Sequence, residues 1–260
     1  MAIPFNPPPE SLPSQSSLEE LLDFDWDTVE SIADDEGWTW DDNRGAYFEG
    51  GNIVSPDRIL SVTRTRMEGY QSQIRSVSND LTSGNISVSE WERRVAEITV
   101  SVALIFFLLG MGSRSKITGD DTEDVKDRLR LQFDYLRNFS EEILNGDLTV
   151  GRLSSRAELY IFDAQNNYSL GQEATHSASE YPFYSNVLGS TMPCEQCPRE
   201  TAKGIVPRGG LISIGQRICL SRCYCSFWYY RTQNESQVQT LPLIGIRDGW
   251  IGVRVPLRAM

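Results

Sequence analysis

The residues of this chain best suited to chemistry are its five cysteines, all of which lie between residues 194 and 225. They form two groups, Cys194-x-x-Cys197 and Cys219-x-x-x-Cys223-x-Cys225. Each short spacing places two thiolates on one turn, and the loop between the groups lets them meet around a tetrahedral ion. The pattern therefore predicts one structural Zn²⁺ site.

Five cysteines compete for the four places on such an ion. We favour Cys194, Cys197, Cys219 and Cys223 as ligands, with Cys225 as an alternative to either of the last two. Four thiolates leave no open position for a substrate, so the metal would stabilise the fold. Neighbouring basic residues would offset the charge of the centre, namely Arg199, Lys203, Arg217 and Arg222. The competing interpretation is a set of buried thiols, or disulfides after oxidation.

The sequence offers little else for catalysis. His176 is the single histidine, and its place after a helical pattern is typical of a helix C-terminus, where positive charge is favoured. One histidine excludes histidine-based hydrolytic metal centres and disfavours a Ser-His-Asp triad. The sequence has no glycine-rich phosphate-binding motif, and the adjacent carboxylates Asp120-Asp121 and Glu141-Glu142 do not face each other on a helix. The sequence predicts that the protein is not an enzyme.

The negative charge of the chain is confined to its N-terminal part. Residues 1–60 hold 14 acidic and 2 basic side chains, which accounts for the whole formal charge of −12. Residues 1–54, which begin with a proline-rich stretch, are predicted to form an extended acidic arm with a docking helix over Leu18–Ile32. This segment docks either on the body of the protein or on a partner with a basic surface. The alternative is a solvated tail.

Targeting signals are not apparent in the sequence. The N-terminus lacks the basic start and apolar stretch of a secretory signal, so we expect a reducing cytoplasm as the site of folding. The longest apolar run, Val100–Met111, is shorter than the roughly 18–20 residues of a spanning helix. It predicts a buried helix and no association with a membrane.

Helical patterns dominate residues 55–177. Apolar positions recur at spacings of three and four in four segments, which begin near Ser55, Ser87, Gly119 and Thr149. Ser55-Pro56 is typical of a capped helix start, and Ser87 with Glu90 is typical of a capping box. The second segment becomes apolar on all sides, which indicates a place at the centre of the fold. The short connectors predict an all-α bundle.

Beyond residue 177 the composition changes to glycine, proline, cysteine and aromatic residues. The stretches Tyr224–Arg231 and Trp250–Val255 predict short strands. Residues 178–260 are therefore predicted to be a cysteine-rich zinc-binding module. The expected fold class is mainly α: a helical bundle with a small C-terminal zinc-knuckle/β appendage and an extended acidic N-terminal arm.

Three stretches of the helical part resemble a known family. Leu131–Phe139, Ile143–Leu148 and Ser155–Tyr160 are similar to the helical core of tailed-bacteriophage minor head proteins, the head-morphogenesis proteins of the Mu type. In that family a helical body precedes a cysteine pair, a loop with proline and glycine, and a final Cys-x-Cys. The same order is found here in Cys194, Cys197, Pro207, Gly215, Cys219, Cys223 and Cys225. The resemblance covers residues 85–228, and it departs at Cys219, where many members carry a histidine.

The resemblance implies a structural protein of the virion. Such a protein is built into the phage head near the portal during assembly in the cytoplasm of the bacterial host. Its expected partners are the portal and the major capsid protein within a larger oligomeric assembly, and packaged DNA is a further candidate.

The residues also allow a second interpretation, a zinc knuckle that binds nucleic acid. Basic side chains next to aromatic ones can hold single strands. The candidates here are Lys203, Arg208, Arg217, Arg222 and Arg231, beside Phe227, Trp228 and Tyr229. The neutral body and the acidic arm oppose binding to phosphates.

Overall fold

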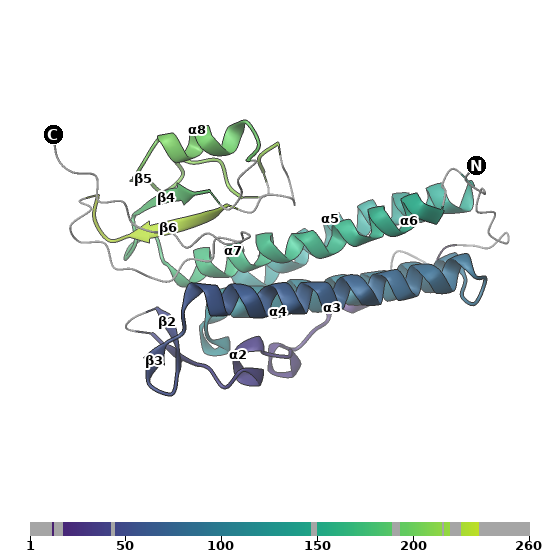
Figure 1. Cartoon of the computed structure of the whole chain (residues 1–260), viewed down its shortest axis with the longest axis horizontal. Coiled ribbons are helices and arrows are strands. Elements are labelled where there is room, and N and C mark those ends of the chain that lie inside the picture. The colour runs from purple at the N-terminus through teal and green to yellow at the C-terminus, as the bar shows by residue number, and fades with distance from the viewer. Residues whose placement is uncertain are drawn as a thin grey trace. The chain divides into compact units, whose positions relative to one another are not determined.

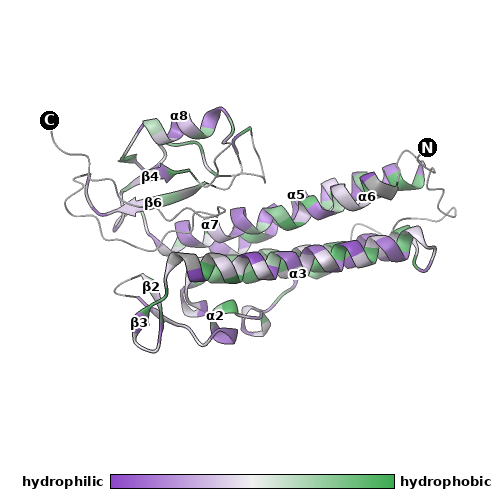
Figure 2. Ribbon diagram, in the orientation of Figure 1, coloured by the Kyte–Doolittle hydropathy of each residue, from purple (hydrophilic) through white to green (hydrophobic). Residues whose placement is uncertain are grey.

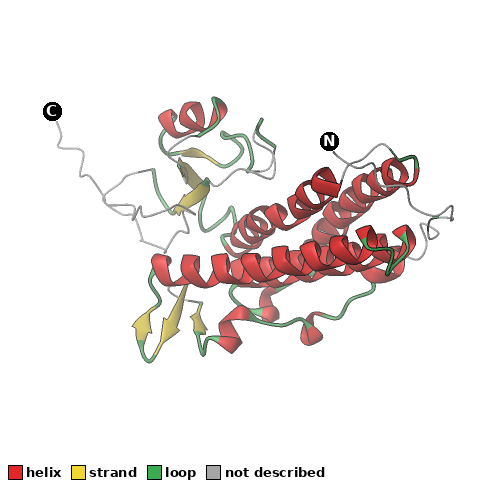
Figure 3. Ribbon diagram, turned by 45° about the vertical axis from the view of Figure 1, so that its right-hand side comes forward, coloured by secondary structure: helices red, strands yellow, loops and turns green. Residues whose placement is uncertain are grey.

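The computed structural model describes residues 12, 18–42, 45–146, 150–188, 193–214, 216–218 and 225–233. These residues are mainly helical, with two small β-sheets (Figure 3). They form two compact units. The first holds the described residues up to Ile32 and from Thr65 to Ala174, and the second holds Ala33–Arg64 and the described residues from Thr175 onward. The division predicted from the sequence, at residues 54 and 177, stays a prediction.

The two longest N-terminal helices begin and end where the sequence predicts. Helix α3 spans Pro56–Thr82, and α4 spans Val88–Met111 (Figure 1). Ser55 Oγ accepts a hydrogen bond from the N–H of Arg58 at 3.2 Å, and Ser87 Oγ accepts one from the N–H of Glu90 at 3.1 Å. These bonds satisfy N–H groups that lack a partner at a helix start. The carboxylate of Glu90 forms ion pairs with Arg93 and Arg94.

Helix α4 supplies much of the core of the first unit. Every residue from Val102 to Met111 is buried, which confirms the prediction made from its apolar run. Trp91, near the start of α4, is fully buried, and its ring meets Phe139 edge-on at 5.4 Å between centroids. The indole N–H of Trp91 donates to Ser78 Oγ on α3 at 3.3 Å. The Trp91 side chain therefore ties α3, α4 and the next long helix together.

By length and composition alone, α4 is also able to cross a membrane. It is the one helix of this kind among the described residues. However, 78% of its most apolar 18-residue stretch is buried inside the protein. Protein side chains thus already cover this helix, as they cover the core helix of a globular fold.

Helix α5 spans Gly119–Leu144 and packs against α4. Thr118 and Asp121 form a reciprocal capping box at its start, which the sequence analysis did not identify. A stripe of residues along α5 faces the core, since all its members are buried: Val125, Leu129, Phe133, Leu136, Ser140 and Ile143. Figure 2 shows hydrophilic and hydrophobic residues mixed along α3 and α5, as expected for helices with one solvent face.

The prediction of one continuous fourth helix is wrong. The chain forms α6 (Val150–Ala157), a 3-10 segment η4 (Glu158–Asp163) and then α7 (Ala164–Thr175). The Asp163 carboxylate ends the 3-10 segment and accepts hydrogen bonds from the side-chain amides of Gln132, Asn166 and Asn167. These polar contacts fix the chain at the break.

The acidic segment before Ile32 packs on the first unit, which is one of the two alternatives left open by the sequence. It does not form one helix but short 3-10 turns, η1 (Glu20–Leu22) and η2 (Trp26–Thr28). The Trp26 ring lies 5.4 Å from that of Phe107, and its N–H donates to Thr122 Oγ1 at 3.0 Å. Arg114 donates to the carbonyl of Trp26 at 3.1 Å. Residues 1–11 and 13–17 lie outside the described residues, and the extended acidic arm expected over residues 1–54 is not confirmed.

The second unit contains a short helix, α2 (Ile32–Asp35), at its start and a three-stranded antiparallel sheet. The strands are β1 (Thr39–Asp41), β2 (Ala46–Glu49) and β3 (Asn52–Ile53), in the order β1-β2-β3. Tyr47 lies 5.8 Å from Trp38 and 4.9 Å from Trp40 between ring centroids. These rings pack against one another and anchor the hairpin.

A second antiparallel sheet lies in the second unit, and Cys225 directly precedes one of its strands. Its strands are β4 (Phe183–Val187), β5 (Val206–Pro207) and β6 (Ser226–Tyr230), in the order β5-β4-β6. Helix α8 (Gln196–Ala202) lies between β4 and β5 in the chain and packs on β4. Strand β6 confirms the strand expected over residues 224–231, whereas β4 and α8 were not predicted. The strand expected at Trp250–Val255 lies outside the described residues.

Candidate metal centre

The first cysteine pair lies on the turn that leads into α8. The N–H of Cys197 donates to the carbonyl of Cys194 at 3.2 Å, and this bond closes the turn. The two Sγ atoms are also 3.2 Å apart. This is far longer than the roughly 2.05 Å of a disulfide, and both residues are thiols in this structure.

Cys225 reaches the same place at the end of the sheet where β4 ends, since Ser226 pairs with Val187. It directly precedes β6, is 2% exposed, and lies close enough to Cys197 to affect its titration. Cys197 and Cys225 belong to an apolar cluster with Tyr184, Leu211 and Phe227, among others, and Cys194 packs against it. Three of the five predicted ligands are thus brought together, and the remaining two, Cys219 and Cys223, lie outside the described residues.

The spacing of the sulfur atoms can be compared with that of a zinc site. In a tetrahedral centre with Zn–S bonds of about 2.3 Å, two sulfurs lie roughly 3.8 Å apart. Cys194 and Cys197 would therefore have to separate by about 0.6 Å, which side-chain rotation can supply. Within the described part of the chain, no group of three or more potential ligands is arranged to hold a metal ion. The zinc site therefore stays a prediction.

The protonation of Cys197 reflects its surroundings. Burial raises the pKa of this thiol to about 11, and the neighbouring Cys194 and Cys225 act in the same direction. A hydrogen bond from Arg217 acts in the opposite direction and lowers the pKa. At neutral pH the Cys197 thiol is protonated here, so a metal ion that binds it must displace a proton.

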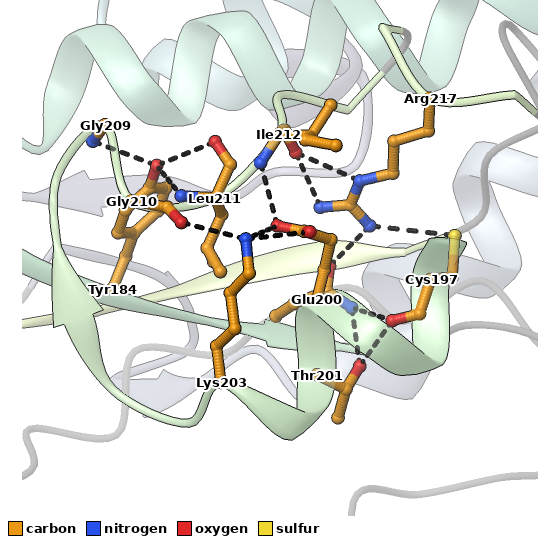
Figure 4. Close-up of polar contacts among 11 residues, drawn as sticks. Tyr184, Cys197, Glu200, Thr201, Lys203, Gly209, Gly210, Leu211, Ile212 and Arg217 are labelled. Carbon is orange, nitrogen blue, oxygen red and sulfur yellow. Dashed lines mark hydrogen bonds and ion pairs between the residues drawn. The ribbon is translucent and has the colours of Figure 1, made fainter. Parts of the chain in front are cut away.

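A polar network surrounds the cysteine turn, and Figure 4 shows its contacts. The Glu200 carboxylate on α8 accepts hydrogen bonds from the N–H of Ile212 at 2.8 Å and from Lys203 Nζ at 3.0 Å. Burial on its own would raise the pKa of Glu200, but these bonds outweigh it and hold the pKa below the ordinary value. Lys203 also donates to the carbonyl of Gly210 at 3.1 Å. The network fixes the loop after β5 against α8.

Tyr184 of β4 holds the same loop from the sheet side. Its hydroxyl accepts hydrogen bonds from the N–H groups of Gly209 and Leu211, at 3.0 and 3.2 Å (Figure 4). Asn186, two residues further along β4, donates to Thr201 Oγ1 at 2.7 Å and to the carbonyl of Cys197 at 3.4 Å. Sequence reasoning missed both side chains. No pattern in the sequence marks them, because the alternation of buried and half-buried positions along β4 is visible only in the structure.

His176 directly follows the last residue of α7, as the sequence suggests, but it is not a solvated helix terminus. It is 3% exposed. Its ring stacks on Tyr229 at 4.5 Å with an interplanar angle of 2°, and it meets Tyr181 edge-on at 4.9 Å. The histidine is therefore part of the aromatic packing of the second unit.

Most of the residues proposed to contact nucleic acid are buried or already pair with another side chain of this chain. Phe227 and Tyr229 are buried, and Arg217 is 0% exposed. Lys203 pairs with Glu200, and Arg231 pairs with Glu180. Arg222 and the side chain of Trp228 lie outside what the structure describes.

Comparison of the chain with protein-family models, with curated proteins and with solved structures gives no match. The cysteine cluster and the helical unit are therefore the features from which a function can be inferred.

Proposed function

We propose that the protein is a structural component of a tailed-phage head, a minor head or head-morphogenesis protein that acts near the portal or capsid through protein–protein contacts. The proposal rests on the resemblance of three helical stretches and on the order of the cysteine motif. The observation that carries it furthest is the meeting of Cys194, Cys197 and Cys225 beside β6, after a mainly helical stretch. This is the order of parts that the resemblance leads us to expect.

The proposal includes one structural Zn²⁺ ion. Cys194, Cys197 and Cys225 would hold it, together with Cys219 or Cys223 from outside the described residues. When bound, the ion would cross-link the turn before α8 to the start of β6, and it would contribute free energy to the folding of this small module. An all-thiolate centre supplies no open position for catalysis, which fits a non-enzymatic role.

The acidic segment before Ile32 is the surface we propose for contact with the assembly. Between Leu18 and Ile32 the chain has six acidic and no basic side chains, and all six acidic ones are exposed: Glu19, Glu20, Asp23, Asp25, Asp27 and Glu30. The apolar residues of the same segment pack on the first unit, with Leu18 and Leu22 buried. The packing holds the charges in place, so that a basic surface on a portal or capsid subunit can meet them.

Sedimentation tests this function. The purified protein is mixed with assembled portal rings or capsids of a phage that encodes it and is centrifuged through a density gradient. We expect it to move with the particles, and we expect the variant Asp23→Asn/Asp25→Asn/Asp27→Asn to do so less. The matched control is Asp120→Asn/Asp124→Asn/Asp127→Asn on α5. Wild-type protein that remains at the top of the gradient with every particle would contradict the proposal.

The nucleic-acid alternative makes a different prediction. It requires an affinity for single-stranded DNA that falls steeply as salt is raised. The burial of Arg217, Phe227 and Tyr229 does not favour it, because buried rings are not accessible for stacking on bases.

A further inference from the structure

Arg217 is the most unusual charged residue of the second unit. It lies in the loop between β5 and β6, and its side chain is completely buried. Burying a guanidinium in an apolar environment is costly unless its N–H groups find acceptors. The acceptors that Arg217 contacts therefore indicate the role of its buried charge.

The guanidinium of Arg217 connects the cysteine turn to the loop and to β4 (Figure 4). Nε and Nη2 both donate to the carbonyl of Ile212, at 3.0 and 2.9 Å. Nη1 donates to Asn186 Oδ1 at 2.8 Å and points to Cys197 Sγ at 3.7 Å. Its planar group also lies 5.5 Å from the ring of Phe227. The guanidinium is held from three sides, with one edge aimed at a sulfur.

A hydrogen bond from a cation that is held in place stabilises the negative charge of a metal-bound thiolate. A thiolate carries negative charge, and a four-thiolate zinc centre has a net charge of about −2. Donors outside the ligand shell orient the ligands and stabilise this charge, and removal of one typically lowers metal affinity 10–100-fold. The same hydrogen bond stabilises a neutral thiol much less, because a hydrogen bond to an ionised acceptor is roughly twice as strong as one between neutral groups.

We propose that Arg217 is a positioning residue for the zinc centre, which it supports by a hydrogen bond to the Cys197 sulfur. This inference rests on the zinc site included in the proposed function. Asn186 completes the arrangement, because it accepts from Arg217 through Oδ1 and donates to the carbonyl of Cys197 through Nδ2. The pair thus fixes both the sulfur and the backbone of the same ligand.

The first test is zinc affinity, measured on the full chain by competition with a chromophoric chelator. We expect Arg217→Gln to bind zinc 10–100-fold more weakly than the wild type. We expect Arg217→Lys to fall between them, because it keeps the charge but not the fork of donors. The control is Arg58→Gln on α3, where the side chain is 48% exposed and pairs with Glu36, and it should bind zinc as the wild type does.

Because Arg217 is buried, its replacement also weakens the fold, and a second measurement separates the two effects. The chain is loaded with Co²⁺ in place of zinc, and the sulfur-to-cobalt charge-transfer band is recorded. Only molecules that hold the metal contribute to this band. Loss of a hydrogen bond to sulfur raises the energy of the sulfur lone pairs, so we expect the band of Arg217→Gln to shift to longer wavelength. The band of Arg58→Gln should not move.

The outcomes of these experiments distinguish the role of Arg217 from the existence of the zinc site. Wild-type protein that binds no zinc would overturn both the site and the role of Arg217. Zinc binding with equal affinity and an unshifted cobalt band in Arg217→Gln would overturn the role of Arg217 alone. Weaker binding with an unshifted band would show that Arg217 supports only the fold, and this too would overturn the inference.

Discussion

A close approach between two helices of the first unit gives a sharp prediction about the packing of the fold. Gly110 on α4 and Gly171 on α7 face each other across this contact. A Cβ atom placed on Gly110 would lie 2.1 Å from the carbonyl oxygen of Tyr168 and 2.9 Å from the backbone N of Gln172. A Cβ atom on Gly171 would lie 2.2 Å from the carbonyl oxygen of Phe107. The obstacles are backbone atoms, which cannot rotate away.

The change Gly110→Ala therefore forces the two helices apart. The 2.1 Å separation is about 1.3 Å short of the 3.4 Å at which ordinary van der Waals contact begins. Overpacking of this kind costs about 1–3 kcal/mol, while the better helix propensity of alanine returns at most about 1 kcal/mol. We expect a net loss of about 1–2 kcal/mol in the free energy of unfolding, and Gly171→Ala should behave alike.

The assay is urea denaturation followed by far-UV circular dichroism. Gly69 on α3 is the matched control, because a Cβ atom there meets nothing within 4 Å. Gly69→Ala should stabilise the protein by about 0.5–1 kcal/mol. If Gly110→Ala were as stable as Gly69→Ala, the close helix contact would be refuted.

Three further predictions concern the core and the metal centre. Trp91→Ala should cost about 3–5 kcal/mol in urea denaturation, whereas Tyr135→Ala, at a side chain that is 60% exposed, should change stability by no more than about 0.5 kcal/mol. Burial raises the pKa of Glu92 from 4.5 to about 7, although Arg137, 2.9 Å away, lowers it. Between these pH values the folded chain keeps a proton that the unfolded chain releases, so this group makes stability fall as pH rises from about 4.5 to about 7. Glu92→Gln removes this titration. The difference in the free energy of unfolding between the wild type and Glu92→Gln should therefore change with pH only between about 4.5 and about 7. A difference that stays constant over this range would contradict the raised pKa of Glu92. Removal of zinc with a chelator should weaken the near-UV circular dichroism of the rings around Tyr184 but leave the far-UV helical signal, and an unchanged near-UV spectrum would count against the zinc site.

The helices of the first unit are predictable because local sequence and burial agree. Val102–Met111 is apolar on all sides, a pattern that places a helix in a protein core or in a membrane, and here all of these residues are buried in the core. The stripe of α5 includes Ser140, which is tolerated because its hydroxyl donates to the carbonyl of Leu136 at 3.0 Å. Periodicity alone therefore gives both the helix and its buried face.

The break between α6 and α7 is not predictable in the same way. It is fixed by Asp163, whose carboxylate collects side-chain amides from two residues nearby and from Gln132, which is 31 positions away. A contact over this distance leaves no mark on the local pattern of apolar residues. The sequence therefore predicts a single helix where the structure has three segments.

In the candidate site, too, local features are predictable from the sequence and long-range contacts are not. Cysteine spacing indicates that the first pair shares a turn, and Cys194 and Cys197 do so. That Cys225 reaches this pair depends on the pairing of β4 with β6, which aligns Val187 with Ser226. The sequence identifies Arg217 as a nearby charge, but its full burial follows from the closure of the loop over α8, which no local pattern reveals.

The role proposed for this chain is that of a structural component of a phage head, stabilised by one zinc ion. The most direct test is to centrifuge heads assembled in cells through a density gradient and to measure this chain and zinc in the same fractions. The account predicts a fixed, low ratio of this chain to the portal protein in the head fraction, with one zinc ion per chain. Heads that form without the chain, while the chain stays at the top of the gradient as a zinc-free monomer, would contradict it.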